Sequence, residues 1–163
     1  MRYFIVLLLC FLQNASYANV AVDQLNETLA KKETVQTKAP KISPILKDLS
    51  QNYYFIFIYR GSCPHCHKFA PILKDFADTF HVDVEAYRID NAPIDGFKSR
   101  PLTPDLFQTL YVAGDYKPMV PALFLVNRDT LQAYAVLFGE ALPYQLASRV
   151  NALMQHIKER FNG

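Results

Sequence analysis

The sequence is poor in cysteine and glycine and carries almost no net charge. Its 163 residues include 3 Cys, 5 Gly and 10 Pro, and the formal net charge is +2. So few cysteines exclude a small domain held together by several disulfide bonds. No run of like charges predicts a nucleic-acid-binding patch or a basic membrane anchor. With 51% hydrophobic residues, the composition is that of a folded globular chain rather than a disordered one.

The first 18 residues have the features of a secretory signal peptide. Arg2 supplies the positive charge at the start, residues 4–12 are all apolar, and Ser16-Tyr17-Ala18 has the small-x-small pattern of a cleavage site. The apolar run is too short to span a bilayer, and a retained anchor is the alternative interpretation. Cleavage after Ala18 predicts export across the membrane into an oxidising compartment.

After the signal peptide, residues 19–41 are predicted to form a mobile N-terminal tether and residues 42–163 a single domain. The tether is rich in Gln, Thr, Lys and Glu, and a segment that contacts a partner is the alternative. The pattern of the domain predicts an α/β fold in the order β–α–β–α–β–β–α, with a central mixed sheet and flanking helices.

Two elements of this domain are predicted most strongly. Residues 53–59 are all aromatic or β-branched and predict a fully buried strand. Residues 64–80 predict a helix that is kinked at Pro71. Its apolar face consists of Cys66, Phe69, Ala70, Leu73, Phe76, Ala77 and Phe80.

The remaining elements follow from turn residues and apolar runs. Further strands are expected over 82–89, 122–126 and 131–138, the last two as an antiparallel hairpin. Residues 91–102 are expected to be a loop. Helices are expected to begin at Thr103-Pro104-Asp105 and at Pro143, because a hydroxyl N-cap and proline at the first helical position favour a helix start.

The motif Cys63-Pro64-His65-Cys66 lies where the first strand ends and the first helix begins. The free N–H groups and partial positive charge of a helix N-terminus stabilise a thiolate, so the pKa of Cys63 is expected to be below about 8.5. His65 is expected to add positive charge or a hydrogen bond, and Pro64 to stiffen the turn. Cys66 lies on the apolar face and is predicted to be the buried resolving thiol. Since a disulfide closing so short a loop adds little stability, we predict thiol–disulfide exchange.

Two other interpretations of the motif remain open at this stage. A zinc or copper site requires two more ligands, of which His67 is the nearest candidate. Cys66 is followed by His67, which gives the C-x-x-C-H pattern of c-type haem attachment, with Met119 or Met154 as the distal ligand. The buried strand before the motif fits a βα unit better than a small helical haem protein. No cofactor and no metal are therefore predicted.

In this arrangement, residues 53–161 resemble the thioredoxin superfamily. The similarity includes Pro71, five residues after the second cysteine, and Val120-Pro121 directly before a predicted strand. It implies a thioredoxin-like fold and a cis peptide bond before Pro121. It also implies that the backbone around Val120 binds an extended substrate segment close to the first cysteine.

More specific similarities point to exported members of this superfamily. Pro64-His65 is the dipeptide of the oxidase DsbA, and Cys66-His67-Lys68 is similar to the isomerase DsbC, but the large insertion of the first and the dimerisation domain of the second have no counterpart. The chain also resembles the TrbB-type disulfide isomerases of F-type conjugative transfer systems. The stretches that carry this similarity are residues 61–69, 71–74, 103–110, 124–127 and 130–131.

The TrbB-type similarity implies a periplasmic isomerase that acts on disulfide-containing transfer and pilus assembly proteins and depends on a redox partner to reset its cysteines. Thioredoxin-type reductases keep a buried acid where this chain has Phe57 and a tryptophan where it has Ser62. Both departures argue against a reductase of that type. A DsbA-like net oxidase and a non-catalytic chaperone or assembly module remain alternatives.

Overall fold

The structure, a computed structural model, describes residues 48–161. The predicted signal peptide (1–18), the predicted tether (19–41) and the predicted start of the domain at residue 42 lie outside the described residues. Within the described part of the chain, no helix is long and apolar enough to cross a membrane.

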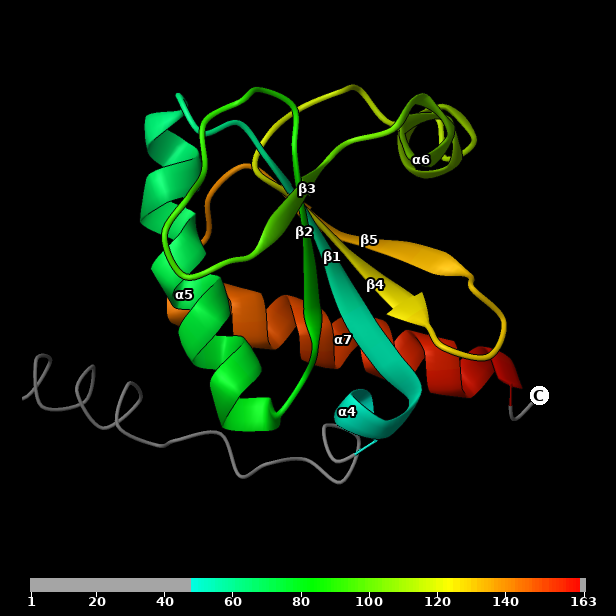
Figure 1. The fold of residues 1–163 in the computed structure, drawn as a ribbon. Helices are drawn as coiled ribbons and strands as arrows, with labels where there is room; N and C mark the ends of the chain where they lie inside the picture. The colour runs from blue at the N-terminus through cyan, green and yellow to red at the C-terminus, as the bar shows by residue number, and fades with distance from the viewer. Residues whose placement is uncertain (1–47, 162–163) are drawn as a thin grey trace, which may run out of the picture. The chain divides into compact units, whose positions relative to one another are not determined.

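A five-stranded mixed sheet forms the centre of the described residues (Figure 1), with the strand order β3-β2-β1-β4-β5. Strands β1, β2 and β3 are parallel to one another, whereas β4 is antiparallel to both β1 and β5. The bounds of the strands are Tyr53–Tyr59 for β1, Val84–Arg88 for β2, Ser99–Pro101 for β3, Ala122–Asn127 for β4 and Ala133–Phe138 for β5.

Helices cover both faces of this sheet. Their bounds are Leu49–Asn52 for α4, Pro64–Phe80 for α5, Pro104–Phe107 for α6 and Pro143–Phe161 for α7, with a π-helical turn η1 at Gln108–Val112 directly after α6. Side chains of α5 and α7 share one hydrophobic cluster with one face of β1. Side chains of η1 share a second cluster with the opposite face of β1 and with β4. The sheet is therefore the middle layer of three.

Strand β1 belongs to both clusters because successive side chains of a strand point to opposite faces. Phe55, Phe57 and Tyr59 lie in the cluster with α5 and α7, and Ile56 and Ile58 lie in the cluster with η1. All five are buried. This confirms that residues 53–59 form a central strand, which is buried except at Tyr54, where the side chain is half-buried.

The helix predicted over residues 64–80 is present with those bounds and continues through Pro71. Every member of the predicted apolar face is buried except Phe80, which is half-buried. The antiparallel β4–β5 hairpin and the helix starts at Pro104 and Pro143 are also confirmed. At Pro104 the Thr103 hydroxyl accepts a hydrogen bond from the Leu106 N–H, as an N-cap residue does.

The expectation that residues 91–102 form only a loop is wrong. Residues Ser99–Pro101 form β3, a short edge strand paired with β2. The Arg88 side chain donates a 2.7 Å hydrogen bond to the Ser99 carbonyl, and Pro101 has no N–H, so this edge is protected from pairing with another chain. A three-residue strand that contains proline has no hydrophobic pattern of its own, so the pairing of β3 with β2 could not be predicted from the sequence.

The chain order is thus a parallel βαβ unit, a third short strand, and an antiparallel pair followed by a covering helix. This arrangement confirms the predicted α/β class, with a central mixed sheet and flanking helices, and the thioredoxin-like fold that the resemblance implied.

Candidate active site

The two cysteines of the motif are held at the junction of β1 and α5. Cys63 is the N-cap residue of α5, with extended backbone angles of φ −92° and ψ 117°, and Pro64 is the first helical residue. The Cys66 N–H donates a 3.0 Å hydrogen bond to the Cys63 carbonyl, which closes the first helical turn. Both cysteines are free thiols, Cys63 half-buried and Cys66 buried.

The pKa of the Cys63 thiol lies below its ordinary value. Burial alone raises this pKa, but the N–H groups of Cys66 and His65, the Cys66 thiol and the Arg60 charge together outweigh burial. Free N–H groups at the start of a helix are the expected source of such stabilisation. Cys63 is thus the accessible sulfur of the pair and the one more readily present as the thiolate.

The surroundings of Cys66 act in the opposite direction. Burial is the main cause that raises its pKa, to about 12, and the neighbouring Cys63 sulfur and the Asp90 charge raise it further. The side chain at Phe57 contributes no charge there and packs among aromatic rings, with centroid distances of 5.9 Å to Phe69 and 5.3 Å to Phe97. Cys66 therefore remains a protonated thiol until its surroundings change.

The His65 imidazole is paired with a carboxylate outside the motif. Its Nδ1 lies 3.2 Å from Glu140 Oε2, in the connection between β5 and α7, and both side chains are well exposed. The His65 contribution to the Cys63 pKa is made by its backbone N–H. Of the two effects expected of His65, positive charge or a hydrogen bond, the structure shows the hydrogen bond, and the backbone N–H rather than the ring makes it.

The turn before Cys63 is fixed by contacts from two other elements. Asp90, which follows β2, accepts hydrogen bonds from the Gly61 N–H at 2.8 Å, the Ser62 N–H at 3.1 Å and the Ser62 hydroxyl at 3.0 Å. His67 Nε2 lies 2.6 Å from the Gly61 carbonyl oxygen. The hydrogen bonds from Gly61 and Ser62 hold the pKa of Asp90 below its usual range, because they stabilise the carboxylate more than burial opposes it.

Gly61 has no space for a side chain. A Cβ atom added there would lie 2.2 Å from the Ala92 carbonyl oxygen and 2.5 Å from the Ala92 Cβ. The loop after β2 therefore packs directly against the backbone of the turn that carries Cys63. Only glycine allows that close approach.

The second predicted part of the site, Val120-Pro121, lies at the start of β4. Pro121 is buried and Val120 is half-buried. Their peptide bond is cis, as the resemblance implied. Val120 and Cys63 both pack against the cluster formed by α5, α7 and β1. The Pro121 carbonyl accepts a 2.7 Å hydrogen bond from the Gly139 N–H.

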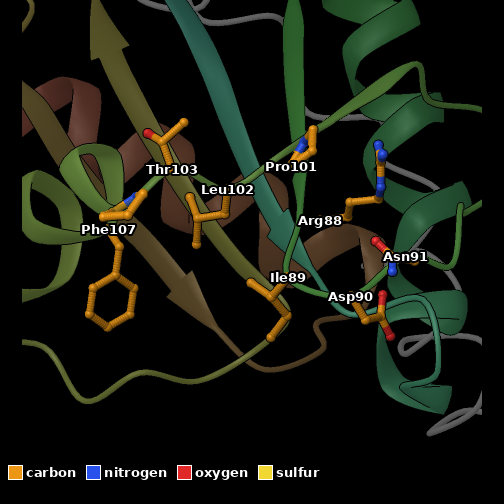
Figure 2. A pocket seen from close by; sticks show the side chains of 9 residues that line it. Arg88, Ile89, Asp90, Asn91, Pro101, Leu102, Thr103 and Phe107 are labelled. Carbon is orange, nitrogen blue, oxygen red and sulfur yellow. The ribbon is translucent and has the colours of Figure 1, made fainter.

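A cleft of about 320 Å³ lies beside the active-site turn, between the loop after β2 and the start of α6. Figure 2 shows Asp90 and Asn91 at one end of this cleft, and Ile89, Leu102 and Phe107 toward the other. The same Asp90 carboxylate that binds the turn before Cys63 therefore also lines this depression.

The alternatives for the cysteine motif gain no support from the positions of the neighbouring residues. Among residues 48–161, no three or more His, Cys, Asp or Glu side chains come together as metal ligands. The Nε2 of His67 lies against the Gly61 carbonyl. Met154, on α7, is buried in the hydrophobic cluster shared with α5 and β1, and Met119 is half-exposed in the loop before β4.

Sequence reasoning assigned no role to Arg60 or Asp90 and considered His67 only as a metal or haem ligand. Arg60 acts through its charge. Asp90 acts through its hydrogen bonds to the turn and through its charge, and His67 acts through its contact with the Gly61 carbonyl. One signal for Asp90 was present, because it directly follows a strand expected to run parallel to β1, and such strands end at the same edge of a sheet. The hydrogen bond of His67 has no signature in the sequence.

The chain matches the protein family described as "TraF: F plasmid transfer operon protein" over residues 11–151. It therefore belongs to this family. It is also 32% identical over 101 residues to "Protein TrbB" of Escherichia coli (strain K12). That match covers 61% of this chain and 55% of the relative, so the similar region spans little more than half of the relative's length.

Two solved structures are similar to the chain at low sequence identity. One is described as "Structure of MTB dsbF in its mixed oxidized and reduced forms", with a TM-score of 0.41, 17% identity, and coverage of 66% of this chain and 84% of that chain. The other is thioredoxin from Trichomonas vaginalis, with a TM-score of 0.41, 16% identity, and coverage of 69% and 87% respectively.

Proposed function

We propose that this chain is a periplasmic thiol–disulfide oxidoreductase whose main reaction is disulfide isomerisation. The observation that carries the proposal is the contrast between its two thiols. Cys63 is accessible at the helix N-terminus with a lowered pKa, and Cys66 is buried behind it with a raised pKa. An attacking thiol needs the first environment, and a thiol held in reserve needs the second.

The reaction begins when the Cys63 thiolate attacks one sulfur of a substrate disulfide. A mixed disulfide forms, and the other substrate sulfur leaves as a thiolate. A different substrate thiolate then attacks the mixed disulfide, which forms a new substrate disulfide and returns Cys63 as the thiolate. No electrons are gained or lost overall, so the isomerase cycle requires no external oxidant or reductant.

When no correct substrate thiolate arrives, Cys66 resolves the mixed disulfide. It loses its proton and attacks the Cys63 sulfur, which releases the substrate in reduced form and leaves a Cys63–Cys66 disulfide. Two electrons have then passed from the enzyme to the substrate. A reducing redox partner must return them before Cys63 attacks again.

The proposed substrates are disulfide-containing proteins of conjugative transfer and pilus assembly. Membership of a family described by its place in the F plasmid transfer operon supports this. The sequence pattern of residues 1–18 supports export to the periplasm. The proposal includes no nucleic-acid partner, and no membrane span of this chain after signal cleavage.

Net oxidation of substrates is the second candidate function. The lowered pKa of Cys63 favours it, because a stabilised thiolate makes the Cys63–Cys66 disulfide a stronger oxidant. The two reactions differ in their need for Cys66. Isomerisation needs only the attacking thiol, whereas net oxidation transfers the disulfide formed by both cysteines.

The test is reactivation of a disulfide-scrambled protein in a glutathione buffer, with wild type, Cys66→Ala and Cys63→Ala compared. The proposal predicts that Cys66→Ala retains most of the rescue and that Cys63→Ala retains none. Rescue only by the two-cysteine enzyme would support oxidation or cycles of reduction and reoxidation. Full rescue by Cys63→Ala would overturn the assignment of the attacking thiol. In a separate binding assay, unchanged binding of unfolded proteins by a variant with serine at both Cys63 and Cys66 would support a chaperone.

A further inference from the structure

The loop that leads into β4 is exposed along most of its length but is attached to the core at one buried hydroxyl. Residues 112–119 are all exposed. The Tyr111 hydroxyl donates a 3.0 Å hydrogen bond to the Met119 carbonyl oxygen. Tyr111 is only 2% exposed, whereas the Met119 side chain is 50% exposed. A buried side chain therefore holds the backbone directly before Val120.

The π-helical turn η1 places Tyr111 in this position. Residues 104–107 are α-helical and residues 108–112 are π-helical, so the last turn carries one extra residue. A π-helical turn changes which side chains face the core, and such turns are frequent at functional sites. Here the turn brings both Leu110 and Tyr111 into the hydrophobic cluster on the η1 face of the sheet.

Aromatic neighbours then fix the direction of the Tyr111 ring. Its centroid lies 5.1 Å from that of Phe107, 5.7 Å from that of Phe124 and 6.2 Å from that of Phe138. Burial is the main cause that raises the pKa of the Tyr111 phenol, so the hydroxyl remains a hydrogen-bond donor at neutral pH. The hydroxyl thus has one fixed direction, and in that direction it meets the Met119 carbonyl.

Tyr116, in the middle of the loop, contacts the aromatic residues around Tyr111. The Tyr116 N–H donates a 2.8 Å hydrogen bond to the Tyr111 carbonyl, and the Tyr116 ring lies 5.1 Å from the Phe138 ring. Gly114 lies in close contact with the Tyr116 ring, since a Cβ added at Gly114 would be 2.3 Å from a carbon of that ring. Beyond the loop, the Gly139 N–H donates to the Pro121 carbonyl at 2.7 Å.

We infer that Tyr111 is a positioning residue that sets the docking backbone at Met119-Val120 for an extended segment of the polypeptide substrate. The inference rests on the proposed function, and on the expectation from the superfamily resemblance that a substrate segment binds beside Val120 while Cys63 attacks its disulfide. Tyr111 touches neither the substrate nor the reacting sulfurs in this account. The exposed Met119 side chain is the neighbouring group that contacts the bound segment.

The test is Tyr111→Phe, which keeps the ring and removes only the hydroxyl. We expect KM for a disulfide-scrambled protein to rise about fivefold, in line with the loss of one hydrogen bond. We expect kcat, and the rate with a small disulfide that needs no docking backbone, to stay at wild-type values. Tyr134→Phe on β5 is the matched control, because its hydroxyl has no hydrogen bond to any residue the structure describes; its KM should not change.

A second readout measures the loop itself. Amide hydrogen exchange at Gly139, whose N–H is bonded to Pro121, should be faster in Tyr111→Phe and unchanged in Tyr134→Phe. The inference is overturned if KM and exchange both equal the wild-type values. It is also overturned if reaction with the small disulfide falls as far as reaction with the protein, since that indicates general damage.

Failure of the proposed function has a different signature from failure of the inference. In that case the wild type itself does not rescue the scrambled protein, whichever tyrosine is present. In that case, hydrogen exchange at the Gly139 amide is the only measurement that tests the role of Tyr111. Faster exchange in Tyr111→Phe supports the positioning role, and unchanged exchange rejects it.

Discussion

The Gly61 N–H donates a 2.8 Å hydrogen bond to Asp90 Oδ1, across 29 positions of the chain. Gly61 follows β1 and Asp90 follows β2, and these two parallel strands end at the same edge of the sheet. From the other side, His67 Nε2 lies 2.6 Å from the Gly61 carbonyl. The position of Cys63 at the helix N-cap is thus set by Asp90, at the end of β2, and by His67, in the first turn of α5.

The first prediction concerns the acid stability of the protein and the substitution Asp90→Asn. The folded pKa of Asp90 is lower than its usual value, so its carboxylate stabilises the fold fully above the unfolded pKa of about 4. This stabilisation is lost as the pH falls through the lower, folded pKa. We therefore expect wild type to be more stable than Asp90→Asn at pH 7, with a gap that closes below about pH 4.

Urea unfolding from pH 7 down to pH 2 measures that gap. Asp129→Asn in the β4–β5 turn removes the same charge away from the active-site turn, and it should reproduce the wild-type pH dependence. A gap between wild type and Asp90→Asn that keeps its size down to pH 2 would contradict the account of the Asp90 hydrogen bonds.

The second prediction concerns the space at Gly61. Gly61→Ala places a Cβ 2.2 Å from the Ala92 carbonyl oxygen, so the turn or the loop after β2 must move. We expect a loss of about 2 kcal/mol in unfolding free energy, the usual range for overpacking. We also expect slower alkylation of Cys63, because the shifted turn disturbs the helix N-cap.

Ser62→Ala is the matched control for Gly61→Ala. It lies in the same turn and removes one exposed hydrogen bond to Asp90 without introducing a clash, so its cost should stay below about 1 kcal/mol. Denaturant unfolding of both variants measures the difference. Equal stability of Gly61→Ala and wild type would show that the close approach to Ala92 is not a constraint.

The third prediction concerns the charge of Arg60, which contributes to the lowered pKa of Cys63. In the reduced protein, the pH profile for alkylation of Cys63 should have its midpoint below that of a free thiol, about 8.5. Arg60→Gln should move the midpoint upward, and added salt should reduce the difference between the two proteins because Arg60 is exposed. Mass spectrometry of the alkylated peptides measures both effects.

Lys68→Gln on the exposed face of α5 is the control, because it removes the same charge from a residue that is not among the causes of the Cys63 shift. Its profile should match that of the wild type. Cys66 should stay unmodified across the neutral range, since it is buried and burial raises its pKa to about 12. A Cys63 midpoint at or above that of a free thiol would contradict the role of the helix N-terminus.

The elements that the sequence predicted best are those whose pattern agrees with their tertiary surroundings. Residues 53–59 and 64–80 have continuous burial or a clear helical face, so periodicity alone gives their bounds. Strand β3 forms because its backbone pairs with β2. The π-helical turn η1 differs from an α-helical turn by one extra residue. Neither difference changes the hydrophobic pattern, so neither was predictable from it.

The candidate site shows the same division. The order of the two cysteines in exposure follows from the helical face, and it was predicted. The contacts of Asp90 and Tyr111 join residues through backbone groups, and a backbone N–H or carbonyl is present at nearly every position. Their partners could therefore be identified only from the folded chain.

The most direct measurement of the central claim is the identity of the cysteine that bonds to the substrate. Cys66→Ala and Cys63→Ala are each incubated with a disulfide-scrambled protein, quenched with acid, and digested for mass spectrometry. The account predicts a mixed disulfide through Cys63 in Cys66→Ala and little or none through Cys66 in Cys63→Ala. Comparable yields through Cys66 would contradict it, because the buried thiol would then be an attacking group as well.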